Sequence, residues 1–353
     1  MLKLLNGLQP EKTSWRLDDK SVRMRHFLAL CLFLQTISLF GFPPRSSRDT
    51  VTQADYTAYH HTIADAHKRI AQKDYQAALA LYRHLFNTYA FVFSRDYKVA
   101  TQLALQTGQK QEAFTYLTKA IGTGWRLNAI QKNALVRTLQ RDPHWRVIKA
   151  QYDSLRSRYQ QGGNQPVRII VRKMFRKDQR KALLALFVPG DKARTRYAEK
   201  RFAPHSEQQV AQLIRLIDTY GYPGEQLIHN GYWAAVILSH HNSISKRYAL
   251  SDTLYPLVRP KLLKAIQLGQ LSPYEFAMID DWYTAIKSDS QETNFGYLSQ
   301  SLTSTATRQV NQAREALGLD SIETIRLLAD LEQQTGFNVY LPSNMTRKIT
   351  ITE

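Results

Sequence analysis

Two stretches of the chain, DYQAALALYRHL at 74–85 and KQEAFTYLTKA at 110–120, repeat one another at an offset of 35 residues and decide the fold. A small residue recurs at Ala78 and Ala113, and large apolar residues recur three or four positions later. This spacing places the large residues along one buried stripe of a helix, while the small residue lets a second helix approach closely. A repeat of this period predicts a stack of helical hairpins.

The repeated pattern resembles the tetratricopeptide repeat. The matching residues are Tyr75, Ala78 and Tyr82 in the first unit, and Gly108, Ala113, Leu117 and Ala120 in the second. Lys110 departs from the pattern, because a tyrosine would stand there.

The resemblance implies a helical module over 52–161 that docks a protein or peptide in a concave groove. The candidate groove residues are Tyr75, Tyr82 and Tyr116. The alternative is a plain stack of hairpins that packs on its neighbour. Because two repeats rarely suffice alone, we expect the second module to cap the stack.

The N-terminal region contains an apolar run, FLALCLFLQTISLFGF at 27–42, that follows a basic flank. This order is typical of a secretory signal, and the run is short for a membrane span, which needs about 20 residues. We therefore predict a signal peptide or short anchor at 24–44, and an exported, periplasmic or envelope-associated protein. Residues 1–23 are then a gene-model extension or a cytoplasmic leader, and a buried core helix at 27–42 is the alternative.

The composition excludes several classes of protein. The single cysteine rules out a disulfide framework and any multi-cysteine metal or iron–sulfur site. A hydrophobic fraction of 43% is too high for wholesale disorder. The net charge of +19 suits an anionic partner without naming one.

A basic stretch follows the predicted linker at 162–166. Between Arg168 and Arg201 there are twelve Lys or Arg residues and three Asp or Glu residues. Most of these charges fall opposite an apolar helical stripe, and no aromatic residues interleave with them as stacking platforms for bases. We expect a solvated or membrane-facing surface, with an anionic polymer as the next interpretation; nucleic acid is disfavoured.

Polar residues interrupt the apolar stripes of three predicted helices in the second module, 167–335. Asp178 falls on the stripe of the first helix. His241 continues one stripe of the helix at 231–241 and His240 continues the other. On the helix that starts near Pro273, spacing does not choose between Asp280 and Asp281. A capping box at 206–209 predicts the start of a further helix.

The segment from about Arg172 to Leu319 resembles an uncharacterised family of exported bacterial helical domains. The motifs that carry the resemblance are Asp178-Gln179, Tyr220–Pro223, Ala234–His241 and Ala277–Asp281. Trp282 stands where that family has an arginine, which weakens any claim of a shared activity. The family has no assigned reaction.

If these helices converge, an aspartate could fix the tautomer of a histidine and make it a general base. The candidate catalytic residues are Asp178, His241 and Asp281, with Gln179, His240 and Asp280 as neighbours in a polar cluster. The same cluster is also typical of a structural network in an inert bundle, or of a ligand site. No nucleophile elbow, phosphate loop, dinucleotide fingerprint or zinc motif is present, so no cofactor or metal is predicted. His60, His61 and His67 are expected on the surface.

The sequence thus predicts an all-α protein with two helical modules and a tail, 336–353, whose last residues alternate like a strand. The leading hypothesis is a non-enzymatic envelope protein that docks another protein through the repeats. The alternative is a hydrolase-like or small-ligand site at the Asp/His/Asp cluster. A second alternative is an anionic-surface binder that uses 168–201, and membrane association through 27–42 or this basic face is expected.

Overall fold

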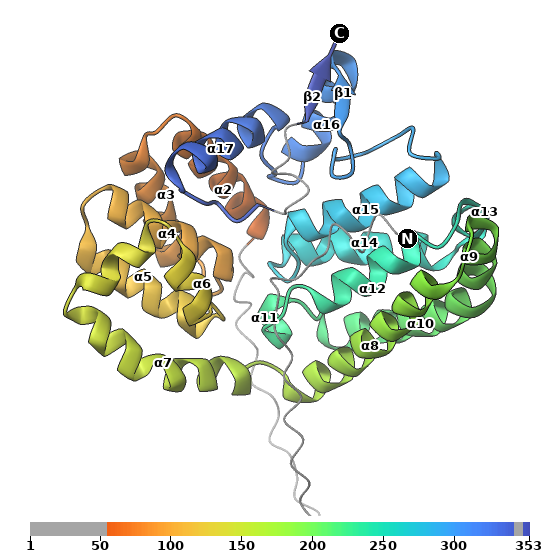
Figure 1. Cartoon of the computed structure of the whole chain (residues 1–353), viewed down its shortest axis with the longest axis horizontal. Coiled ribbons are helices and arrows are strands. Elements are labelled where there is room, and N and C mark those ends of the chain that lie inside the picture. Colours follow the sequence, from red (N-terminus) through yellow and green to blue (C-terminus); the bar gives the residue numbers. More distant parts are fainter. Residues whose placement is uncertain (1–54, 342–348) are drawn as a thin grey trace, which may run out of the picture. The chain divides into compact units, whose positions relative to one another are not determined.

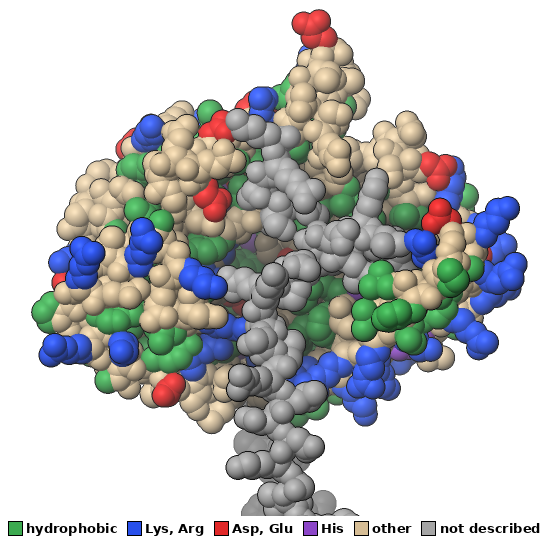
Figure 2. All heavy atoms as spheres, in the orientation of Figure 1, with side chains coloured by type: hydrophobic (Ala, Val, Ile, Leu, Met, Phe, Trp, Pro, Cys, Tyr) green, Lys and Arg blue, Asp and Glu red, His purple; other side chains and the backbone are tan. Residues whose placement is uncertain are grey.

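The computed structural model describes residues 55–341 and 349–353 (Figure 1). The predicted leader at 1–23 and the predicted signal or anchor at 24–44 lie outside these residues. The described chain is helical apart from one two-stranded parallel sheet, so the all-α prediction is confirmed. Within this part of the chain, no helix combines the length and apolar character that crossing a bilayer requires. Lys and Arg side chains dominate the charged surface in Figure 2, as the net charge demands.

The first module is a series of helices joined by short turns. Its elements are α2 (Tyr56–Ala71), α3 (Tyr75–Thr88), α4 (Ser94–Gln106), α5 (Lys110–Gly122), α6 (Leu127–Lys132), η1 (Val136–Arg141) and α7 (His144–Gln161). The side chain of Asp74 caps α3 by accepting from the backbone N–H of Ala77 at 3.2 Å. Ala78 and Ala113 are fully buried, and α2 packs on α3 as α4 packs on α5. The helical hairpins expected from the repeat are therefore present.

The second module surrounds a short central helix. Its elements are α8 (Gln165–Leu184), η2 (Ala185–Phe187), α9 (Asp191–Tyr197), η3 (Ala198–Phe202), α10 (Ala203–Tyr220), α11 (Glu225–Ile228), α12 (Trp233–Asn242), α13 (Lys246–Ser251), α14 (Leu254–Gln267), α15 (Pro273–Lys287), β1 (Ser301–Thr303), α16 (Ser304–Glu315), α17 (Ile322–Thr335) and β2 (Thr350–Thr352). Helix α12 contacts α8, α10 and α15, and every residue from Ala234 to Asn242 is buried. Side chains on all faces of α12 therefore lie in the protein interior.

The two modules share a buried polar contact. His67 of α2 lies 2.8 Å from Asp320, measured from Nδ1 to Oδ2, and Tyr274 of α15 donates to the same carboxylate oxygen. Helix α17 also packs on α2. The predicted linker is itself held in place, because the N–H of Asn164 donates to the carbonyl of Leu227 at 2.8 Å. The second module therefore covers α2, as expected for a cap.

The C-terminal strand has a partner that the sequence did not reveal. Residues 350–352 of β2 pair in parallel with residues 301–303 of β1. Leu302, Val310, Ile322 and Ile349 form a small apolar cluster beside this pair. The alternation seen in the sequence is thus realised as a strand that β1 and helix α16 support.

Candidate functional site

The predicted Asp/His/Asp cluster is divided among three separate sets of partners. Asp178 of α8 pairs with His240, not His241, at 2.6 Å between Oδ2 and Nδ1. Both side chains are buried, and Gln179 donates its Nε2 to the same oxygen of Asp178 at 3.3 Å. Among the described residues, Nε2 of His240 has no hydrogen-bond partner. This pair has the arrangement in which a carboxylate fixes the histidine tautomer that leaves Nε2 able to accept a proton.

His241 faces a different set of residues. Its Nδ1 lies 3.0 Å from the hydroxyl of Ser206, and its Nε2 lies 3.3 Å from Oδ1 of Asp252. The second distance suits an ion pair, yet Nε2 lacks hydrogen-bond geometry toward any partner, so we regard this contact as electrostatic. Burial raises the pKa of Asp252, yet this pKa ends below its usual value because of the nearby His241 and the backbone N–H groups of Leu254 and Tyr255, which donate to its carboxylate.

Ser206 also corrects the predicted helix start. Helix α10 begins at Ala203, and Ser206 is buried inside the helix with its hydroxyl on His241. The predicted capping box at 206–209 is therefore not an N-terminus. The sequence pattern predicted that the Ser206 hydroxyl would cap the helix backbone, but this hydroxyl forms a hydrogen bond with the buried imidazole of His241.

Asp281 organises a loop. Its two carboxylate oxygens accept from the backbone N–H groups of Asn294, Phe295 and Tyr297, at 2.6–2.9 Å, and from the hydroxyl of Thr293 at 2.9 Å. Burial raises the pKa of Asp281, against the lowering effect of these donors. With four donors on one buried carboxylate, the geometry is that of a structural anchor.

Asp280 is paired as well. It accepts from the hydroxyl of Tyr255 at 2.6 Å and from Nε of Arg259 at 2.6 Å, and its other oxygen accepts from Asn294 at 2.8 Å. No hydrogen bond or ion pair joins Asp178, His241 and Asp281 to one another in the part of the chain that the structure describes. Nor does any group of His, Cys, Asp and Glu side chains in the described residues have an arrangement that could hold a metal ion.

A second candidate site lies where the chain leaves α17 and crosses α4. Nε2 of Gln102 donates to the carbonyl of Asn338 at 2.7 Å, and the N–H of Asn338 donates to Oε1 of Gln102 at 3.0 Å. One buried side-chain amide therefore satisfies both backbone groups of a single residue in an irregular segment. Such an amide recognises the backbone of an extended chain independently of its side chains.

The crossing segment, 336–341, is held by alternate residues. Phe337, Val339 and Leu341 are buried, and Phe337 stacks on Tyr75 with ring centroids 5.7 Å apart. Gly336 begins the segment with a φ of +73°, and a Cβ at this position would lie only 2.6 Å from Cβ of Ala134. Glycine is needed here because it adopts this backbone without strain.

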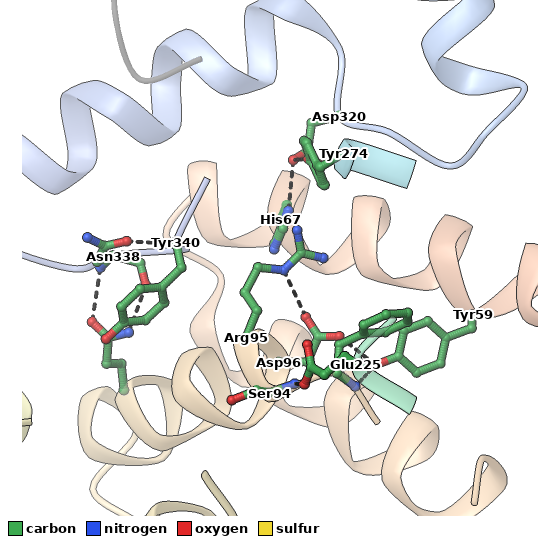
Figure 3. Close-up of polar contacts among 12 residues, drawn as sticks. Tyr59, His67, Ser94, Arg95, Asp96, Glu225, Tyr274, Asp320, Asn338 and Tyr340 are labelled. Atoms are coloured by element: carbon green, nitrogen blue, oxygen red, sulfur yellow. Dashed lines mark hydrogen bonds and ion pairs between the residues drawn. The ribbon is translucent and has the colours of Figure 1, made fainter. Parts of the chain in front are cut away.

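Tyr340 completes these contacts beyond Asn338 (Figure 3). Its hydroxyl accepts from Nδ2 of Asn133 at 3.1 Å, its ring meets Trp125 edge-on, and Lys98 lies 5.2 Å from its ring centroid. We call the surface that receives the segment the α4 face. Its residues are Tyr75, Lys98, Gln102, Trp125 and Asn133.

The groove tyrosines expected from the repeat are placed differently. Tyr82 is fully buried and Tyr116 is 6% exposed, so both belong to the core between the helices. Tyr116 donates to Glu112 at 2.5 Å and meets Phe86 edge-on. Of the three tyrosines, Tyr75 contacts the 336–341 segment, through Phe337. Tyr82 and Tyr116 thus serve helix packing. Apart from Tyr75, the α4 face consists of residues outside the matched repeat positions: Lys98, Gln102, Trp125 and Asn133.

A buried polar network joins the modules beside this face (Figure 3). Tyr59 donates to Asp96 at 2.5 Å, and Arg95 lies 3.2 Å from the same carboxylate. Glu225 of α11 accepts from the N–H of Ser94 at 2.5 Å. Burial raises the pKa of Glu225 to about 7, against the lowering effect of the Ser94 N–H.

The histidines of α2 were expected on the surface, and this is wrong for two of them. His67 is buried on Asp320, and His60 is buried beside Phe93 with its Nε2 unsatisfied. Burial, followed by the charge of Arg95, lowers the pKa of His60 to about 3. The error arose because the second module covers the face of α2 that carries both residues.

Comparisons with known proteins do not assign the chain to a family, since no family model, curated protein or solved structure matches it. Both resemblances drawn from the sequence therefore remain predictions.

Proposed function

We propose that this protein is a docking module whose α4 face binds an extended peptide segment. The proposal rests on the pair of hydrogen bonds between the Gln102 amide and the backbone of Asn338. The chain's own segment 336–341 is then an internal occupant of a face that also accepts a segment from a partner protein. The predicted export would place this activity in the cell envelope.

The contacts at the α4 face support this proposal because the hydrogen bonds that would give affinity do not depend on the side chains of the bound peptide. Backbone hydrogen bonds to Gln102 are available to any extended peptide. Tyr75 and Trp125 offer aromatic surfaces for side chains on either side of the bound residue. A partner segment should therefore be extended and carry apolar or aromatic residues at alternate positions, as 337–341 does.

The experiment uses a labelled peptide of residues 335–341, TGFNVYL, and the full chain with Phe337→Ser and Tyr340→Ala. These substitutions weaken the internal occupant and leave the α4 face unchanged. Fluorescence anisotropy should show saturable binding of the peptide to this variant, and at least tenfold weaker binding to the wild-type chain, whose own segment competes.

Two further variants decide the interpretation. Adding Gln102→Ala should reduce peptide affinity by about tenfold, because two hydrogen bonds of about 0.5–1.5 kcal/mol each are lost. Adding Gln111→Ala, an exposed glutamine of α5, should leave the affinity unchanged. Absence of saturable binding to a variant that retains a cooperative thermal transition would overturn the proposal.

A second candidate function, a general-base site, is favoured by one observation. Asp178 and His240 form a buried pair at 2.6 Å, and Nε2 of His240 has no partner among the described residues. In this reading His240 accepts a proton from a bound nucleophile while Asp178 stabilises the charged imidazole. The pairing replaces His241 in the predicted cluster and leaves Asp281 outside it.

Hydrolysis of p-nitrophenyl acetate by the full chain tests this candidate. Asp178→Asn should reduce the rate about 10²-fold or more, the usual contribution of general base catalysis. His84→Gln, an exposed histidine of α3, is the matched control. Equal rates for the wild-type chain, Asp178→Asn and buffer would exclude an esterase activity at this pair.

A further inference from the structure

Exposed apolar side chains gather at the C-terminal end of α8. Phe187 is 76% exposed, Leu184 is 53% exposed, and Leu183 and Leu186 are also exposed. Ile169, near the start of the same helix, is 65% exposed. Soluble proteins normally expose few contiguous groups of leucine, isoleucine and phenylalanine side chains. Where such a group is exposed, it marks an interaction site.

The same side of α8 is strongly basic. At 100° per residue, four cationic residues fall on the arc that carries Ile169, Leu183 and Leu184. They are Arg172, Lys173, Arg176 and Arg180, and all four are exposed. We call this surface, together with Phe187, the α8 face.

These cations are not neutralised by nearby acids. The structure pairs none of the four with an Asp or Glu among the described residues. Asp178, the only acidic residue of α8, turns inward to His240. Although the Arg172 side chain is exposed, partial desolvation, followed by repulsion from Arg176 and Arg168, lowers its pKa. The face therefore presents uncompensated positive charge around exposed hydrocarbon.

We propose that the α8 face binds the surface of an anionic lipid bilayer, with Leu183, Leu184 and Phe187 entering the acyl boundary. Figure 2 shows apolar side chains bordered by Lys and Arg over this part of the second module. The charges match lipid phosphates, and the apolar side chains match the hydrocarbon just beneath them. A second copy of the chain would bring the same positive charges together, so self-association through this face is opposed.

The apolar residues also distinguish a bilayer from a soluble polyanion. A nucleic acid or polysaccharide would engage the four cations and leave Leu183, Leu184 and Phe187 in water. The bilayer uses both kinds of side chain, so removing either kind should weaken binding.

Co-sedimentation of the full chain with vesicles tests the proposal. The probes are vesicles of phosphatidylcholine alone and of phosphatidylcholine mixed with phosphatidylglycerol. The mixed vesicles should bind at least tenfold more tightly, and the preference should fall as salt is added. Leu183→Ser with Phe187→Ser, and separately Arg176→Glu with Arg180→Glu, should each weaken binding about tenfold or more.

Matched controls lie elsewhere on the surface. Leu327→Ser removes a 55% exposed leucine from α17, and Arg146→Glu reverses an exposed arginine of α7. Both should bind mixed vesicles like the wild-type chain. Every variant retains the apolar run at 27–42, so differences among them report on the α8 face alone.

Binding to heparin, a soluble polyanion, distinguishes a bilayer-binding surface from a polyanion-binding surface. The proposal predicts that Leu183→Ser with Phe187→Ser binds heparin as the wild-type chain does, while its vesicle binding falls. If this variant instead retains full vesicle binding, the surface is a polyanion site or a solvated face and the bilayer proposal is wrong.

Discussion

Gln102 and Asn338, 236 positions apart in the chain, are joined by two hydrogen bonds between one side-chain amide and the backbone N–H and C=O of a single residue. The donor and the acceptor of Gln102 are each used once on the backbone of Asn338. Asn133 supports the arrangement by donating to the same Oε1 at 3.2 Å. These contacts tie the 336–341 segment to helix α4.

Removing this amide should loosen the segment without unfolding the array. Gln102→Ala is expected to lower the free energy of unfolding by about 1–3 kcal/mol, because it removes two hydrogen bonds and leaves two backbone groups unsatisfied. Gln111→Ala should change it by less than about 0.5 kcal/mol. Urea denaturation measures both. Equal stability of the two variants would mean that water replaces Gln102 without cost.

The Asp281 anchor predicts a local effect. Asp281→Asn replaces one acceptor oxygen with an NH₂ group that faces backbone donors, so we expect a loss of about 2–4 kcal/mol and early amide exchange at 294–297. Asp289→Asn, on an exposed carboxylate, is the control. Unchanged exchange at 294–297 in the Asp281 variant would contradict the anchoring role.

The contact between the modules predicts coupling. Asp320 bonds both His67 and Tyr274, so Asp320→Asn and His67→Gln should not be additive. A double-mutant cycle on the free energy of unfolding should give an interaction energy of about 0.5–3 kcal/mol. Additivity within about 0.3 kcal/mol would show that the pair contributes nothing to joining the modules.

Two buried groups predict opposite responses to pH. The pKa of His60 is lowered to about 3, so the unfolded chain binds its proton first and stability falls as pH drops from about 6.5 toward 3. The pKa of Glu225 is raised to about 7, so the stability it adds is complete below about pH 4.5 and is lost as pH rises through 7.

Variants separate these two contributions. His60→Asn should flatten the acid side of the stability curve, and Glu225→Gln should flatten the region between pH 4.5 and 7, each by up to about 1.4 kcal/mol per pH unit. Thermal unfolding across this pH range provides the measurement. Curves that stay parallel to the wild type would show that neither group is perturbed in the folded chain.

Local pattern predicted the helices well because short-range spacing decides them. The 35-residue repeat located the hairpins through Ala78 and Ala113, which are buried as expected. The same pattern predicted Tyr82 and Tyr116 in a groove, whereas both side chains are buried in the core. Spacing reports that a side chain is buried and does not report which element covers it.

The partners of the buried polar residues could not be predicted without the tertiary structure. His240 and His241 both continue apolar stripes, and α12 is buried on all sides, so periodicity could not choose the partner of Asp178. Gln102 lies in a part of α4 where residues 99–104 are all buried, so periodicity could not show which element contacts its amide. Its partner lies near the far end of the chain, and no local rule connects the two.

Hydrogen exchange on the wild-type chain, with and without excess unlabelled TGFNVYL peptide, can show whether the α4 face exchanges its internal segment for a peptide. If the α4 face is a peptide-binding site with an internal occupant, the peptide should displace that occupant. The amides of 337–341 should then lose protection while those of α4 keep theirs. Unchanged protection of 337–341, at peptide concentrations that saturate the chain with Phe337→Ser and Tyr340→Ala, would show that the segment is a fixed part of the fold and would contradict the account.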